Sequence, residues 1–132
     1  MMATKRRKKG TNTMRQLFRS LCCAGLLAGL AGIASAAQVN GILIDKMCSA
    51  KATSGGQKAA MAHDTECAKA PACEKSGYGV FTADNKWLAF DDAGNKKAVA
   101  ALKGTKKKDD LKVQVSGDVQ GDSIKVTKVK LM

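Results

Sequence analysis

Residues 78–103, YGVFTADNKWLAFDDAGNKKAVAALK, decide the fold, because two short strands and a helix follow one another there. Residues 78–82 and 86–90 are rich in aromatic and branched apolar side chains, which favour strands. Between them lies Ala83-Asp84-Asn85, and aspartate and asparagine both tolerate the backbone of a tight turn. The segment therefore predicts a β-hairpin that leads directly into a helix.

The helix is predicted over residues 93–103. Asp91 or Asp92 can cap it, because an aspartate at the N-cap accepts a hydrogen bond from a free backbone N–H group of the first turn. The apolar residues of the segment lie near one face, and Gly104 is the kind of residue that ends a helix. The order strand, strand, helix is thus set in the middle of the chain.

Three further strands flank this unit. Residues 39–45 are apolar and β-branched, and residues 111–115 and 124–131 alternate apolar with polar side chains. Five strands with a helix between the third and the fourth is the order of an oligonucleotide/oligosaccharide-binding (OB-type) barrel. We predict a mainly β fold, a small five-stranded OB-like antiparallel barrel, which residues 37–132 form as a single domain.

The segment between the first two strands has a different character. Residues 49–58 are small and polar and predict a loop. Residues 59–70 can carry a short helix, which ends before Pro71 because the residue before a proline avoids the α region. The insertion is therefore predicted to be a loop with a short helix, and it carries the residues with the most chemical potential: Cys48, His63, Cys67 and Cys73.

Residues 1–36 have the pattern of a secretory signal peptide. A basic stretch that includes residues 5–9 precedes an apolar run over residues 21–34, which ends in the small residues Ala34-Ser35-Ala36. Met14 opens a more compact version of the same pattern and is the alternative start. We expect an exported protein, periplasmic or secreted, with no stable membrane span once the signal is cleaved.

More than half of the net positive charge lies in this segment and would be removed with the signal peptide. The whole sequence has 23 Lys and Arg against 11 Asp and Glu, a net charge of +12. Residues 1–36 hold seven of the basic residues and none of the acidic ones, so the remainder carries only +5. The partner is unknown, and after export a cell-envelope component, an anionic glycan or a protein is expected rather than a nucleic acid.

Three cysteines remain after cleavage, in an oxidising compartment. We favour a disulfide between Cys48 and Cys73, with Cys67 as the alternative partner, because Cys48 follows the first strand and Cys73 precedes the second, and these strands are antiparallel neighbours in the predicted barrel. Closing a loop of about 25 residues contributes roughly 3 kcal/mol in the chain-entropy account. The insertion would then be stapled at its two ends.

A metal site competes with this disulfide. One imidazole and two or three thiolates from Cys48, His63, Cys67 and Cys73 suit zinc. His63 and Cys67 are four residues apart and share a face if that stretch is helical. Copper(I) is conceivable as well, because Met61 adds a thioether close to His63.

The sequence resembles a group of small exported bacterial domains of unknown function. Members read G-x-x-x-D-x-x-C near the mature start, continue with a histidine and two further cysteines, and end in V-x-V-x-G and G-D-x-I-x-V. The matching residues here are Gly41, Asp45, Cys48, His63, Cys67, Cys73, Val113, Val115, Gly117, Gly121, Asp122, Ile124 and Val126. The resemblance implies an exported OB-like fold and supplies no activity.

The four aromatic residues after residue 36 all lie in the predicted hairpin. Phe81 and Phe90 are expected in the core, which leaves Tyr78 and Trp87 as candidates for a surface platform that stacks a ligand, as OB folds do. No residue pattern typical of catalysis is present, and no catalytic residue is predicted. An active site built around a single histidine in a loop would have little structure to exclude water.

Two functions follow from these patterns. The first is an exported, non-enzymatic binding or stability module of unknown ligand, with a disulfide-stapled loop and no cofactor. The alternative is a periplasmic protein that binds zinc or copper, or works in redox chemistry, through the Cys/His loop.

Overall fold

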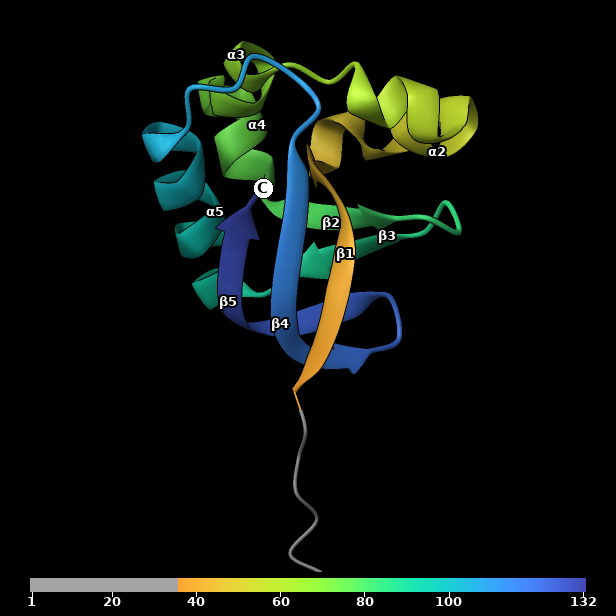
Figure 1. The fold of residues 1–132 in the computed structure, drawn as a ribbon, viewed down its shortest axis with the longest axis vertical. Coiled ribbons are helices and arrows are strands. Elements are labelled where there is room, and N and C mark those ends of the chain that lie inside the picture. The colour runs from red at the N-terminus through yellow and green to blue at the C-terminus, as the bar shows by residue number, and fades with distance from the viewer. Residues whose placement is uncertain (1–35) are drawn as a thin grey trace, which may run out of the picture. The chain divides into compact units, whose positions relative to one another are not determined.

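The computed structural model describes residues 36–132. The predicted signal peptide, its cleavage site and the alternative start at Met14 therefore fall almost wholly on residues 1–35, outside the described residues. The five strands close into a barrel in the order β1-β2-β3-β5-β4 (Figure 1). Their bounds are β1 (Ala37–Asp45), β2 (Tyr78–Thr82), β3 (Trp87–Phe90), β4 (Lys112–Gln120) and β5 (Ser123–Leu131). The predicted five-stranded OB-like barrel is confirmed.

The strand pairing is antiparallel except at one seam. β1 pairs antiparallel with both β2 and β4, β2 with β3, and β4 with β5. β3 and β5 run parallel, with Ala89 opposite Ser123 and Phe90 opposite Ile124. This parallel seam closes the barrel, so the description "antiparallel" holds for the other four ladders only.

The helix between the third and fourth strands is also present. α5 (Asp92–Gly104) begins after Asp91, whose Oδ1 accepts the backbone N–H of Gly94 at 2.9 Å. Asp91 is therefore the cap, as one of the two predicted candidates. The hairpin turn agrees with the prediction too, since Asn85 in the turn has a φ of 60°, a conformation that asparagine tolerates.

The insertion between β1 and β2 is helical almost throughout. It consists of α2 (Lys46–Met61), α3 (Thr65–Lys69) and α4 (Pro71–Ser76), which gather at one end of the barrel in Figure 1. The prediction of a loop over residues 49–58 is wrong. Asp45 caps a helix that starts directly after β1, and buried Ala52 and Ala60 pack against the core.

Pro71 has two effects on this insertion. α3 ends at Lys69, two residues before the proline, in keeping with the sequence prediction. The same proline then opens α4 at its first position, where its fixed φ suits a helix and its missing N–H has no helical partner to lose. Ala70 alone therefore separates α3 from α4.

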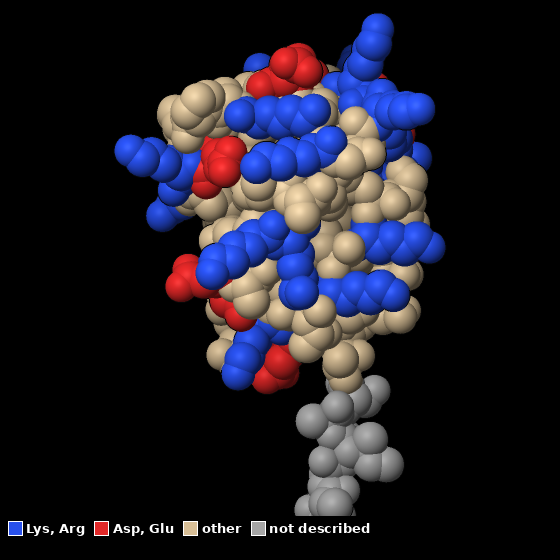
Figure 2. Space-filling model, turned by 90° about the vertical axis from the view of Figure 1, so that its left-hand side faces the viewer, with Lys and Arg blue, Asp and Glu red and all other residues tan. Residues whose placement is uncertain are grey.

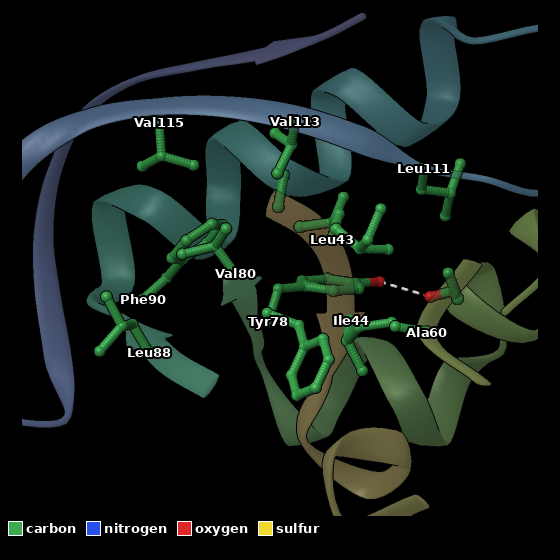
Figure 3. Packing of buried hydrophobic residues seen from close by; sticks show 14 of the residues in the cluster. Leu43, Ile44, Ala60, Tyr78, Val80, Leu88, Phe90, Leu111, Val113 and Val115 are labelled. Carbon is green, nitrogen blue, oxygen red and sulfur yellow. Dashed lines mark hydrogen bonds between the residues drawn. The ribbon is translucent and has the colours of Figure 1, made fainter. Parts of the chain in front are cut away.

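The core lies inside the barrel and continues beneath the insertion. Figure 3 shows Tyr78 among Leu43, Val80 and Val113, with its hydroxyl directed toward the helices. That hydroxyl donates a hydrogen bond to the carbonyl of Ala68 at 2.6 Å, which ties the barrel to α3. Tyr78 is only 2% exposed. Its predicted place on a surface platform is wrong, because both faces of β2 are covered.

Trp87, the other platform candidate, is partly buried. Its Nε1–H donates to the carbonyl of Ile44 at 3.1 Å, and the indole lies so close to Gly79 that a Cβ there would meet the ring at 2.5 Å. The Trp87 side chain therefore contacts both β1 and β2. A ligand-stacking role for Trp87 stays a prediction.

The barrel surface is basic on one side. Figure 2 shows lysines outnumbering acidic residues on the face that it presents. β5 explains part of this, because buried Ile124 and Val126 alternate with exposed Lys125, Lys128 and Lys130. No helix in the described part of the chain is long and apolar enough to cross a membrane.

Candidate metal centre

Each of the three helices of the insertion has a cysteine at its third residue. These are Cys48 in α2, Cys67 in α3 and Cys73 in α4. The first two follow an N-capping aspartate three residues earlier: Asp45 accepts the N–H of Cys48 at 3.0 Å, and Asp64 accepts that of Cys67 at 2.6 Å. The repeated D-x-x-C pattern is thus a helix cap that also fixes the position of a thiol.

Asp45 has a second role in this cluster. Its side chain is fully buried, and its other oxygen, Oδ2, lies 2.9 Å from Nε2 of His63, whose side chain is 7% exposed. The contact falls short of hydrogen-bond geometry, and neither Oδ2 nor Nε2 has another hydrogen-bond partner. Because an unpaired buried polar group is costly, these two atoms are a place where a bound ligand or ion can improve the pairing.

His63 does not share a helix with Cys67, contrary to the sequence prediction. It lies in the turn between α2 and α3, where its backbone N–H donates to the carbonyl of Ala60 at 3.2 Å. The turn nevertheless brings the imidazole to the thiol. Asp45 fixes the ring from the barrel side, which the spacing of four residues alone does not reveal.

Three potential ligands meet at one point. The ligand atoms of Cys48, His63 and Cys67 all lie within 4.8 Å of one another, and the two sulfur atoms are 4.0 Å apart. With zinc–sulfur bonds of about 2.3 Å, two sulfurs of a tetrahedral site are about 3.8 Å apart. The spacing therefore fits a tetrahedral thiolate site.

Cys73, the fourth predicted ligand, is a neighbour of this group and does not belong to it. It is buried at 7% exposure, and its thiol lies near Asp45 and Cys67, both of which raise its pKa. Met61, the proposed thioether ligand for copper, is 39% exposed and does not line the pocket described below.

Cys48, Cys67 and Cys73 are free thiols in this structure. The predicted closeness of the two ends of the insertion is confirmed, because Asp45 of β1 lies opposite Tyr78 of β2. Cys48 nevertheless faces Cys67, the alternative partner, at a sulfur distance well above the roughly 2.0 Å of a disulfide bond. The predicted pairing of Cys48 with Cys73 stays a prediction.

The site disfavours thiolates in the absence of a cation. Burial, followed by the negative charge of Asp45, raises the pKa of the Cys48 thiol to about 12 and that of Cys73 to about 11. Since the thiolate is the nucleophile, both thiols are poor nucleophiles at neutral pH. A bound cation changes this, because a metal ion displaces the thiol proton and compensates the charge of Asp45.

These pKa values predict a loss of stability at high pH for the reduced, metal-free protein. A thiol whose pKa rises above its ordinary 9.0 on folding stabilises the fold fully below pH 9, and this contribution disappears as the pH rises through the folded-state value. The melting temperature of wild type should therefore fall more steeply between pH 9 and 11 than that of Cys48→Ala. Ser49→Ala, a non-titrating neighbour, should follow wild type. Parallel curves of melting temperature against pH for all three proteins would contradict the raised pKa of Cys48.

A pocket of about 170 Å³ opens next to the three ligands. Its lining combines the ligands with apolar side chains and two charged residues: Ile44, Cys48, Lys51, Ala52, Ala59, Ala62, His63, Asp64 and Cys67. The cluster is thus accessible from one side. Small molecules of a few heavy atoms fit a space of this size, since an engineered apolar cavity of about 150 Å³ holds benzene.

Comparison with protein-family models, curated proteins and solved structures gives no match to this chain. The family resemblance of its motifs stays a prediction, and the residues themselves carry the functional argument.

The sequence predicted Cys48, His63 and Cys67 as ligands together with Cys73, which lies outside the group of three, and it assigned no role to Asp45. The capping role has a sequence signal, because an aspartate stands three residues before Cys48 and another three residues before Cys67, and each marks the start of a helix. The contact between Asp45 and His63 joins residues 18 positions apart, and no local pattern indicates it.

Proposed function

We propose that this is an exported, non-enzymatic domain that binds one thiophilic metal ion, zinc(II) in the first place, through Cys48, His63 and Cys67. The observation that carries the proposal is the convergence of their three ligand atoms within 4.8 Å. Thiolate and imidazole together suit zinc, and they also suit copper(I). Export is inferred from the basic, apolar and small-residue pattern of residues 1–36.

Asp45 supports zinc as the first choice. A zinc-bound histidine usually donates its other ring N–H to a carboxylate, which fixes the tautomer and the orientation of the ring. Oδ2 of Asp45 lies 2.9 Å from Nε2 of His63, so this carboxylate is placed to take that role once the other ring nitrogen, Nδ1, binds the metal. The buried carboxylate also supplies negative charge next to the cation.

The raised thiol pKa values of Cys48 and Cys73 argue against thiol catalysis. A catalytic cysteine needs a lowered pKa, whereas that of Cys48 is raised to about 12. We therefore assign no catalytic residue.

Zinc titration of the reduced protein tests this function. Wild type should take up one equivalent in competition with a chromophoric chelator, and Cys67→Ser should lose at least about 100-fold in affinity, beyond the usual loss of an outer-shell partner. Glu66→Gln is the matched control, because Glu66 is exposed and adjacent and should not contribute. Absence of binding by wild type, or equal affinities for all three proteins, would refute the metal site.

A second candidate function uses the two cysteines of the same site without a metal ion. The sulfur atoms of Cys48 and Cys67 are 4.0 Å apart, so a small movement would allow a disulfide that staples α2 to α3. The domain would then be a binding or stability module with a stapled insertion. The number of free thiols separates this function from the metal site.

The partner that we propose is an anionic component of the cell envelope. Exposed lysines on β5 and on α5, among them Lys96 and Lys97, form no ion pair within residues 36–132, whereas Lys86 and Lys112 do. Unpaired basic groups attract anionic polymers such as acidic glycans.

A further inference from the structure

A zinc ion held by Cys48, His63 and Cys67 has one coordination position left, because zinc sites in proteins are almost always four-coordinate. Two groups compete for this position. One is the thiol of Cys73, which would close the site and make it structural. The other is a ligand from outside the chain, which would enter through the pocket.

The position of Cys73 argues against closure. It lies beside Asp45 and Cys67, and it belongs neither to the ligand group nor to the lining of the pocket. All three ligands, in contrast, line the pocket. The three ligands thus lie at the wall of the pocket, and Cys73 is not part of that wall.

The pocket has the properties of a small ligand site. Ile44 and the three alanines at positions 52, 59 and 62 give it apolar walls, which strengthen electrostatic interactions inside. Lys51, one turn after Cys48, supplies a positive charge and forms no ion pair within residues 36–132. Asp64 also lines the pocket, but its Oδ1 is engaged by the backbone N–H of Cys67.

We propose that the fourth coordination position is open to this pocket and accepts a small anionic donor, such as a thiolate or a pseudohalide, beside Lys51. This inference rests on the proposed metal site and specifies what that site does. The domain would exchange a ligand at its metal, whereas a site closed by Cys73 would only hold the insertion together.

The cobalt(II) form of the protein tests the inference, because its visible spectrum reports the coordination of the metal. Adding azide should change the ligand-field bands in a saturable way. Lys51→Ala should weaken azide binding about two- to fivefold, the effect of losing one exposed charge pair. Lys58→Ala is the matched control on the same helix outside the pocket lining, and it should bind azide like wild type.

Cys73→Ser should retain one equivalent of cobalt and the azide response, and Cys73→Ala gives the same readout if the buried serine impairs folding. Loss of cobalt from both Cys73 variants, with a wild-type spectrum that azide leaves unchanged, would establish a closed site and overturn the inference while metal binding stands. If wild type takes up no cobalt at all, the proposed function itself fails. Equal effects of the two lysine substitutions would remove Lys51 from the ligand site.

Discussion

Asp45→Asn should lower the zinc affinity about 10- to 100-fold while the barrel remains folded. Asparagine is as good an N-cap as aspartate, so the hydrogen bond from the N–H of Cys48 is retained. Its second polar atom is an NH₂ group, which donates and cannot accept the Nε2–H of His63. The imidazole then loses the partner that fixes its tautomer, and the negative charge beside the metal disappears.

Asp64→Asn provides the matched control for this prediction. Asp64 caps α3 in the way that Asp45 caps α2, with Cys67 as the residue that donates its N–H. The histidine contact, however, belongs to Asp45. Competition titration should therefore show nearly wild-type zinc affinity for Asp64→Asn. Equal losses in both variants would mean that the caps matter to the site and that the contact with His63 does not.

Tyr78→Ala should destabilise the protein by about 3–5 kcal/mol, the usual effect of deleting a buried aromatic side chain. The ring is 2% exposed inside the barrel, and its hydroxyl reaches the carbonyl of Ala68. Tyr78→Phe keeps the ring and removes only this hydrogen bond, which leaves a buried carbonyl unpaired and should cost about 1–3 kcal/mol.

Urea unfolding of the two variants checks this prediction. Burial raises the pKa of Tyr78 to about 12, in agreement with a phenol that stays neutral and donates. If Tyr78→Phe is as stable as wild type, the hydrogen bond does not hold α3 to the barrel. If Tyr78→Ala loses less than about 1 kcal/mol, the ring is not part of the core.

The barrel was predictable because its signals are local. Alternation in β4 and β5, the aspartate cap of α5 and a turn with Asn85 each reflect backbone preferences within a few residues. The parallel contact of β3 with β5 was not predictable in this way. It depends on how the chain returns after β4, over a separation that no short pattern records.

The helical insertion shows where local reasoning failed. Residues 49–58 contain Ser, Thr and two adjacent glycines, a composition typical of a loop. In the structure they are part of α2, whose backbone departs from helical geometry at Gly56 with a φ of 69°. Tertiary contacts decide the outcome, because the alanines at positions 52 and 60 are buried against the core.

Three of the four predicted ligands belong to the candidate site, and their arrangement was not predictable. The residue types indicated a Cys/His cluster. The division between Cys48, His63 and Cys67 on one side and Cys73 on the other depends on how the three helices pack against one another. The interior position of Tyr78 has the same origin. Sequence alternation assigns faces of a strand, and it does not reveal that both faces of β2 are buried.

The most direct test of the metal centre is a joint count of metal and thiols on the full chain recovered from cells without added reductant. Elemental analysis should find one equivalent of metal, and unfolding in the presence of a chelator and a thiol reagent should titrate all three cysteines that lie within residues 36–132. No metal together with a single reactive thiol among these three would contradict the account and leave the disulfide-stapled module in its place.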